Sequence, residues 1–280
     1  MISEADVQEL LESRDLIAVG VRADDVRRRL HGARTTFVRV FEVHVDAIPA
    51  AVPARTSAGE FRIVGRPASA DAAIAAARAV VALANGTPVT AFSLADLLAL
   101  DGPSSLGAIS RSLREIGVEG IAEAPIDLLD DAAGAVAAVR GGGLSVLRLT
   151  VHGDGGSDRR LLPERARDVQ AAAGGIRAFA PLPRAISVAS PTTGYDDVKQ
   201  IALARVIAAN IESIQVDWQL YGPKLAQFAL TTGADDVDSI AAHEPGTLGT
   251  RRSAIEEIRG NIRSAALEPV ERNARFEAIV

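Results

Sequence analysis

The chain has 280 residues, of which 48% are hydrophobic, and its formal net charge is −6. This length suits one large domain with a sizeable core. The acidic balance argues against nucleic acid or an anionic membrane as a partner. The sequence contains no cysteine. A disulfide framework, a cysteine-based zinc site, a thiol nucleophile and a cysteine-held iron–sulfur cluster are therefore excluded.

The first sixteen residues are acidic and amphipathic, unlike a signal or transit peptide. No apolar run approaches the roughly 20 residues that span a bilayer. We therefore expect a cytoplasmic protein. Residues 3–31 predict one or two helices, with Ser3 as the N-cap. We expect a single domain with an N-terminal helical segment at 1–34, a barrel at 35–240 and a C-terminal helical tail at 241–280.

Residues 35–48 predict the first strand. Phe37, Phe41 and Val43 share one face of this strand, and Glu42, His44 and Asp46 share the other.

Helices and short strands alternate along the rest of the chain. Strands are predicted at 61–65, near 87–92, before 121, at 143–151, at 174–186 and at 214–220; helices are predicted at 69–83, after 93, from 106, at 163–173, from 193, from 223 and at 253–265. Residues 233–239 are predicted to form an acidic loop. Sustained alternation predicts a parallel sheet, and the length suits a (β/α)₈ barrel. An open doubly wound sheet is the alternative, although the usual nucleotide-binding glycine motifs are missing.

The stretch from 193 to 239 carries a resemblance to a known family. The matching residues are Asp197, Lys199, Ala202, Ala204-Arg205, Asn210-Ile211, Trp218, Gly222, Ala226-Gln227, Leu230, Gly233-Ala234-Asp235-Asp236 and Asp238, followed by Pro269-Val270-Glu271-Arg272. They resemble the radical-SAM enzymes of the futalosine route to menaquinone, most of all aminofutalosine synthase. Cyclic dehypoxanthine futalosine synthase and FO synthase are more distant kin. The resemblance covers nearly the whole chain, most tightly after about residue 174, and it implies a radical-SAM-like barrel.

Two departures from the family bear on chemistry. The family holds a [4Fe–4S] cluster with three cysteines in the loop after the first strand, where this chain has alanines, prolines and Arg55. Glu123-Ala124-Pro125 replaces a glycine-rich turn of the family, so a ligand cannot approach that backbone as closely. The comparison implies no iron–sulfur cluster and no radical initiation, and leaves SAM as a candidate ligand.

Ligand sites of barrels lie at the C-terminal ends of the strands. The polar residues on the strand faces supply the ligand-binding candidates: Glu42, His44, Asp46, Glu123, Arg148, His152, Arg184, Gln215 and Asp217. Of these, Glu42, His44 and Asp217 are the catalytic candidates. For the Glu42 group, a solvated strand end with an internal histidine–carboxylate contact is favoured over a metal or acid–base site. For Asp217, pairing with Arg148 or Arg184 is favoured.

Other polar groups are weaker candidates. His152 with Asp154 is balanced between a ligand contact and a polar strand end, and His31 and His243 are expected to be solvated. For Asp235, Asp236 and Asp238, a helix-capping loop is favoured over a cation site. Trp218 is expected in the core or a pocket wall.

Three functions remain open. The first is a cluster-less homologue of the family that binds a nucleoside, a chorismate-derived compound or SAM in the barrel lumen, linked to menaquinone biosynthesis. The second is a non-catalytic partner, a pseudoenzyme that forms a heterodimer with a true radical-SAM paralogue; a homodimer is the simpler assembly. The third is a metal-dependent lyase or hydrolase that uses Glu42, His44 and Asp46.

Overall fold

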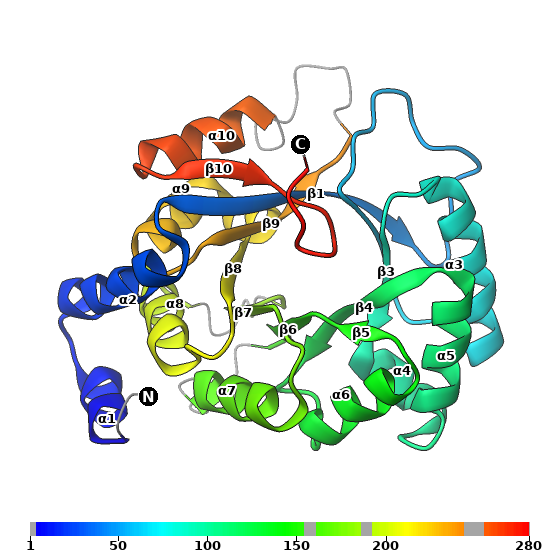
Figure 1. Ribbon diagram of the computed structural model, residues 1–280, viewed down its shortest axis with the longest axis horizontal. Coiled ribbons are helices and arrows are strands. Elements are labelled where there is room, and N and C mark those ends of the chain that lie inside the picture. Colours follow the sequence, from blue (N-terminus) through cyan, green and yellow to red (C-terminus); the bar gives the residue numbers. More distant parts are fainter. Residues whose placement is uncertain (1–3, 154–160, 186–191, 244–254, 280) are drawn as a thin grey trace.

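Eight parallel strands form a closed barrel in the computed structural model, which describes residues 4–153, 161–185, 192–243 and 255–279 (Figure 1). The strands are β1 (Arg34–His44), β2 (Glu60–Val64), β3 (Val89–Ser93), β4 (Val118–Pro125), β6 (Arg148–Val151), β7 (Ala178–Pro183), β8 (Ser213–Asp217) and β9 (Asp236–Ala241). They pair in this order, and β9 pairs with β1 to close the ring. The barrel predicted from the sequence is confirmed.

Helices surround the barrel (Figure 1). They are α1 (Glu4–Glu12), α2 (Leu16–His31), α3 (Ala70–Ala84), α4 (Leu94–Asp101), α5 (Leu106–Ile116), α6 (Ala132–Gly141), α7 (Leu162–Ala173), α8 (Gly194–Ile207), α9 (Trp218–Thr231) and α10 (Ile255–Ser264). Local chemistry sets several of their starts. The Ser69 hydroxyl caps α3 by accepting from the Ala72 amide at 3.1 Å, as its sequence predicts. Helices α1 and α2 pack on α8 through a separate apolar cluster that includes Val7 and Leu203.

The main core lies between the strands and the helices. Alternate strand residues, such as Ile63 on β2 and Leu149 on β6, point outward into this layer and are fully buried. Their neighbours in the sequence, Arg62 and Arg148, point into the lumen and meet there. The outer face of these strands therefore packs on the helices, and the inner face carries charged side chains into the lumen.

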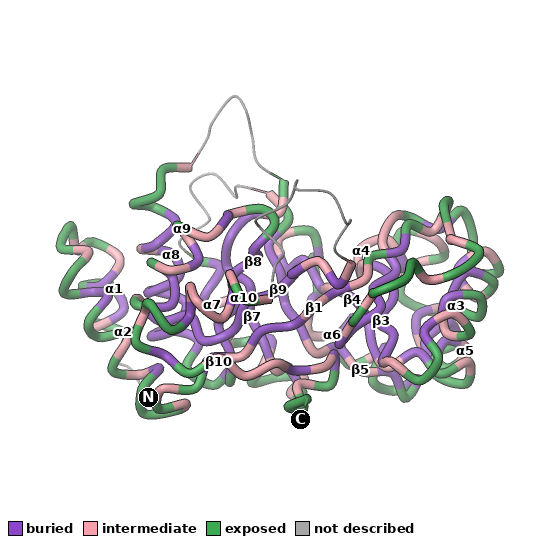
Figure 2. Tube along the Cα trace, turned by 90° about the horizontal axis from the view of Figure 1, so that it is seen from above, coloured by how far each residue is buried: buried purple, intermediate pink, exposed green. Residues whose placement is uncertain are grey.

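The chain's C-terminal part closes the lower end of the barrel, where the strands begin. Strand β10 (Glu268–Glu271) pairs with the first residues of β1, and the Ala274 amide donates to the Gly59 carbonyl just before β2. Arg272 forms two hydrogen bonds of 2.6 Å with the buried Asp236. Figure 2 shows the C-terminus on this side of the molecule. The expected helical tail therefore also contributes a strand. A further two-residue strand, β5 (Ser145–Val146), pairs with β4.

The predicted strand at 214–220 is wrong at its end. Strand β8 stops at Asp217, whose carboxylate accepts from the Leu220 amide at 3.0 Å and so caps α9. Trp218 begins the helix and is buried in the core as expected, whereas Gln219 is exposed on the helix and does not face the lumen. The alternation of the sequence continued past the cap, which hid the boundary.

The predicted acidic loop at 233–239 is also wrong, because Asp236–Ala241 forms β9. Asp235, Asp236 and Asp238 are buried, and arginines distant in the sequence neutralise them. They form neither a cation site nor a helix-capping loop. Ser3 and Asp154, predicted as a cap and a site residue, lie outside the described residues.

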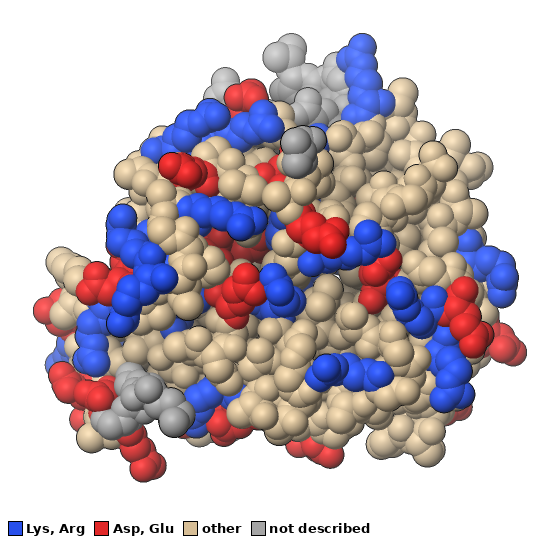
Figure 3. Space-filling model, in the orientation of Figure 1, with Lys and Arg blue, Asp and Glu red and all other residues tan. Residues whose placement is uncertain are grey.

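Within the described ranges, no helix combines the length and apolar character that crossing a membrane requires. Acidic and basic side chains are interspersed over the face that carries the C-terminal part (Figure 3).

Candidate ligand site at the mouth of the barrel

Four charged residues fill the middle of the lumen, and we call them the buried quartet: Glu60, Arg62, Arg148 and Asp238. Arg62 donates to both oxygens of Glu60, at 2.8 and 3.0 Å, and to Asp238 at 2.8 Å. Arg148 also contacts both carboxylates. Two cations and two anions thus close a ring without net charge.

The quartet sets the pKa of its own acids. Burial alone would raise the pKa of Glu60, but Arg62 and Arg148 outweigh burial and lower that pKa to about 2. The pKa of Asp238 is likewise held well below its usual value, against burial, by Arg148 and Arg62. The Thr90 hydroxyl adds a hydrogen bond of 2.6 Å to Glu60. Both carboxylates therefore stay ionised at neutral pH.

Arg184 lies above the quartet, at the end of β7. Its Nε atom is 3.0 Å from the Glu123 carboxylate, and its terminal nitrogens are 3.7 Å from Asp217 and 3.5 Å from Asp238. The favoured pairing of Asp217 with an arginine therefore exists, through Arg184. Asp217 uses one oxygen to cap α9 and presents the other to Arg184.

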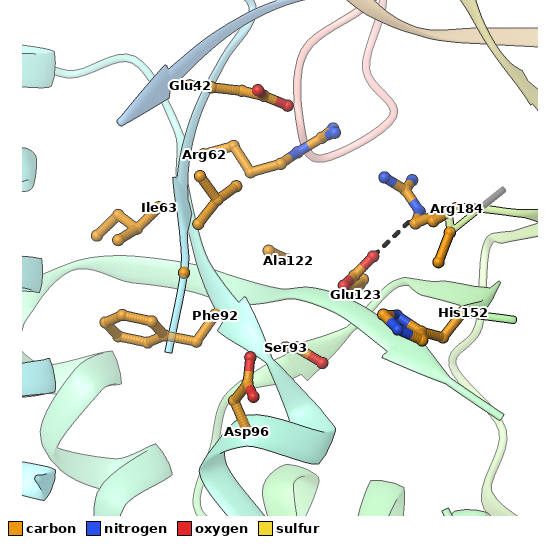
Figure 4. Close-up of a pocket in the computed structure, with 13 residues that line it drawn as sticks. Glu42, Arg62, Ile63, Phe92, Ser93, Asp96, Ala122, Glu123, His152 and Arg184 are labelled. Carbon is orange, nitrogen blue, oxygen red and sulfur yellow. Dashed lines mark ion pairs between the residues drawn. The ribbon is translucent and has the colours of Figure 1, made fainter. Parts of the chain in front are cut away.

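A cavity of about 220 Å³ opens above these residues at the C-terminal ends of the strands, and we call it the mouth pocket (Figure 4). Its lining comprises Glu42, Arg62, Ile63, Val64, Gly65, Phe92, Ser93, Asp96, Ala122, Glu123, His152, Arg184 and Ala185. In Figure 4 the side chains of Glu123, Arg184 and His152 converge on the open space, while Ile63 and Phe92 turn away from it. Charged and polar groups therefore converge on the pocket, and apolar residues form much of the rest of its lining.

Two carboxyls of the mouth pocket have perturbed acidity. Partial burial raises the pKa of Glu42, and Asp217 and Asp238 add to the shift against the opposing field of Arg62. Glu42 is still open to solvent on its outer side. Burial also raises the pKa of Asp96, partly offset by Arg66. Neither carboxyl forms an ion pair with another described residue.

Backbone geometry supports the shape of the pocket at two places. The Asp127 carboxylate accepts from the amides of His152 and Gly153, each at 2.8 Å, and so holds the end of β6 in position. Phe92 has a φ of +62°, a conformation that strains a residue with a side chain by about 1–3 kcal/mol. Phe92 is the penultimate residue of β3 and directly precedes Ser93 on the pocket wall. Strain of this kind concentrates at functional sites.

The structure sorts the predicted site residues into three groups. Glu42, Glu123, His152 and Arg184 line the mouth pocket. Arg148, Gln215 and Asp217 are buried and paired below or beside it, where Gln215 donates to Asp236 at 2.6 Å.

His44 and Asp46 lie outside the mouth pocket. Their side chains are 53% and 82% exposed, and they approach each other to 3.7 Å. This is the solvated strand end favoured from the sequence. Among the described residues, no three histidine or carboxylate side chains are placed to hold a metal ion. The metal-dependent alternative built on Glu42, His44 and Asp46 is therefore not supported by the geometry.

Sequence reasoning missed several residues of the site. Arg62, Ser93 and Asp96 line the mouth pocket, and Glu60 and Asp238 complete the buried quartet. An available signal was the charge of Arg62 inside the apolar run from Phe61 to Val64. Asp238 could not be found this way, because its strand was taken for a loop. His31, expected in solvent, instead lies 3.3 Å from Asp235.

Solved structures share the whole barrel. Methylornithine synthase (PylB) matches with a TM-score of 0.69 at 16% identity, over 99% of this chain and 96% of that one. HydG, a maturase of the [FeFe]-hydrogenase, matches with a TM-score of 0.66 at 12% identity, over 98% of this chain and 73% of that one. At identities this low the matches show the fold class alone, a closed parallel barrel surrounded by helices.

The sequence comparison adds a more specific similarity. Residues 180–279 match the CofH/MqnC C-terminal region. The chain is 30% identical to aminodeoxyfutalosine synthase of Streptomyces coelicolor over 136 residues, which are 41% of this chain and 35% of that protein. It is 34% identical over 122 residues to cyclic dehypoxanthine futalosine synthase of the same organism, covering 41% of this chain and 31% of that protein.

A third relative is 5-amino-6-(D-ribitylamino)uracil–L-tyrosine 4-hydroxyphenyl transferase 1 of Methanosarcina barkeri, at 30% identity over 40% of this chain and 35% of that protein. The resemblance seen in the sequence is confirmed for the C-terminal part of the chain, whereas its extension over nearly the whole chain is not shown by these matches. The matches span about a third of the length of each of these relatives.

The residues present do not fit a [4Fe–4S] cluster. The connection from 45 to 59, between β1 and β2, contains no cysteine, and its only charged residues are Asp46 and Arg55. A cluster of this kind needs thiolate ligands in most proteins and a cationic side chain supplies none.

Proposed function

We propose that this protein binds a small polar ligand in the mouth pocket and acts on it, or senses it, without a cysteine-held iron–sulfur cluster. The mouth pocket itself carries the proposal. It lies at the C-terminal end of a parallel barrel, where ligand sites of this fold are found. Polar side chains from β1, β2, β3, β4 and the residues after β6 and β7 converge there. The zero cysteine count supports the second half of the proposal.

The volume of the mouth pocket limits the size of the ligand group that it can enclose. A volume of about 220 Å³ is below the roughly 300–1,000 Å³ that holds a drug-sized compound. Arg62 of the buried quartet lines the pocket, and the rest of the quartet fills the lumen. The ligand classes are those that the family resemblance implies: a nucleoside, a chorismate-derived compound or SAM, of which the mouth pocket would enclose one part. A link to menaquinone biosynthesis belongs to the same proposal, because two of the similar proteins are futalosine synthases.

A thermal-shift screen tests this function. The purified protein is titrated with adenosine, SAM, an enolpyruvyl benzoate and futalosine-type nucleosides. A ligand at a hundred times its Kd stabilises the folded state by about 2.7 kcal/mol, so a specific ligand raises Tm clearly.

Two histidine variants locate the site. His152 lies in the mouth pocket with an exposed side chain, and His44 is exposed at the end of β1 outside it. We expect His152→Ala to weaken the ligand's effect on Tm and His44→Ala to leave it unchanged. Equal effects of both variants, or a screen without any shift, would contradict the proposal. A flat screen together with co-purification of a radical-SAM paralogue would favour the partner function.

A further inference from the structure

The charges around the mouth pocket do not balance. The buried quartet below it is neutral in itself, because each arginine contacts both carboxylates. Its two arginines are therefore already neutralised. Arg62 reaches the pocket wall, but both of its carboxylate partners lie within 3.2 Å of its nitrogens. The quartet cannot act as a free cation for a ligand.

Above the quartet, the acids outnumber the bases. Glu42, Asp96, Glu123 and Asp217 lie in or beside the mouth pocket. Arg184 pairs with Glu123 and Asp217, and the fields of Arg62 and Arg184 also act on Glu42. Arg66, which is exposed, acts on Asp96 through space. Four carboxyls thus outnumber Arg184 and Arg66, the two guanidinium groups outside the quartet, and His152 lies beside them. The raised pKa of Glu42 and of Asp96 is the expected consequence of this excess together with burial.

We infer that the ligand of the mouth pocket is an organic cation whose ammonium groups pair with carboxyls of the pocket wall, among them Glu42 and Asp96, which lie on opposite sides of the pocket (Figure 4). This inference rests on the proposed ligand-binding function and names its ligand class. An ammonium group offers three donors and supplies the missing counter-charge. The carbon chain of the ligand would lie against Val64, Ala122 and Ala185. A compound with two carboxylates, such as a chorismate-derived enolpyruvyl benzoate, is disfavoured because it adds to the repulsion.

A metal ion is the other way to balance such charge. The described residues do not offer three histidine or carboxylate ligands around one point, so the geometry favours the organic cation. A cation that binds through ion pairs also competes with protons. Its affinity should therefore fall as the pH is lowered through the raised pKa of Glu42.

Calorimetric titration with three four-carbon probes tests the inference. The probes are 1,4-diaminobutane, butane-1,4-diol and succinate, which differ in charge but little in size. At pH 8 and low salt we expect the diamine alone to bind. Glu42→Gln and Asp96→Asn should each weaken its binding at least about fivefold, as expected for loss of a hydrogen bond to a charged group. Asp46→Asn, which removes an exposed carboxylate from the same end of the barrel, should leave the affinity unchanged.

The outcomes separate this inference from the proposed function. Binding of the diol or of succinate in a manner sensitive to His152→Ala would overturn the charge inference and leave ligand binding intact. Failure of all three probes would overturn the charge inference, while the nucleoside screen decides the proposed function independently. Diamine binding that Glu42→Gln and Asp96→Asn do not affect would place the cation elsewhere and also overturn it.

Discussion

At the scale of single residues, the lumen is filled by charged side chains that are almost completely buried. A buried ion pair contributes little compared with apolar packing, but removing one partner leaves an uncompensated charge. We expect Arg148→Met to destabilise the protein by about 3–5 kcal/mol, because Glu60 then keeps only Arg62, and Asp238 keeps Arg62 and the more distant Arg184. Arg114→Met is the control, since Arg114 forms an exposed pair with Glu119 that is worth about 0–1 kcal/mol. Urea unfolding measures both variants.

A double variant tests whether charge balance governs the stability of the buried quartet. The double variant Arg148→Met with Glu60→Gln removes one charge of each sign, so it should recover part of the stability lost by Arg148→Met alone. Equal unfolding midpoints for the single and double variants would show that charge balance does not govern this site.

Glu42 connects stability with binding. Its pKa is raised in the folded protein, so ionisation above that pKa disfavours the folded state. We expect Glu42→Gln to raise Tm at pH 8, and the gain to vanish below about pH 4, where the carboxyl is protonated in both states. Scanning calorimetry between pH 4 and pH 8 measures the difference in Tm between the variant and the unmodified protein. Asp46→Asn should show no gain; a lower Tm for Glu42→Gln at pH 8 would contradict the raised pKa.

At the scale of elements, the junction of α2, α8 and β9 depends on one glycine. Gly233 has a φ of +119°, and an added Cβ would lie 2.9 Å from the Arg205 side chain and 3.0 Å from Ala23. Gly86 has a similar φ of +93° but open space around it. We expect Gly86→Ala to destabilise the fold by about 1 kcal/mol through backbone strain, and Gly233→Ala by about 2–4 kcal/mol because helix packing must also shift.

Denaturant unfolding of the two glycine variants gives the comparison directly. Equal losses would mean that the α2–α8 junction tolerates the added carbon. Since Arg205 also contacts Asp235 and the Gly233 carbonyl, displacement of its side chain would disturb the start of β9 as well.

At the scale of the whole molecule, the two ends of the barrel have different roles. The chain from 268 to 279 closes the lower end, and the mouth pocket opens at the upper end. The charged lumen between them should make the fold sensitive to acid. Glu60 has its pKa lowered from 4.5 to about 2 by folding, so its contribution is present above pH 4.5 and is lost as the pH falls from there through 2.

The free energy of unfolding should therefore decline steeply between about pH 4.5 and pH 2. Because the quartet is buried, 0.5 M sodium chloride should change this decline little, whereas surface pairs are screened. Urea midpoints measured at several pH values, with and without salt, give the result. A profile that is flat across this range would show that the quartet does not control acid stability.

The sequence by itself determined the alternation of strands and helices, helix starts such as Ser69, the absence of thiolate ligands and the resemblance of the C-terminal part. These depend on neighbours along the chain or on composition. It placed Glu42, Glu123, His152 and Arg184 at the strand ends, since parallel strands bring those ends to one face.

Only the tertiary structure decided which charges cancel. Arg62 and Asp238 are 176 positions apart, and their contact exists because β1 lies between β2 and β9 in the closed ring. From the sequence alone, Asp238 is predicted in a loop and Arg148 is predicted as a ligand contact, because neither prediction includes the closure of the barrel. Periodicity fixes the face on which a side chain lies, but the partner across the lumen depends on the curvature and register of all eight strands together.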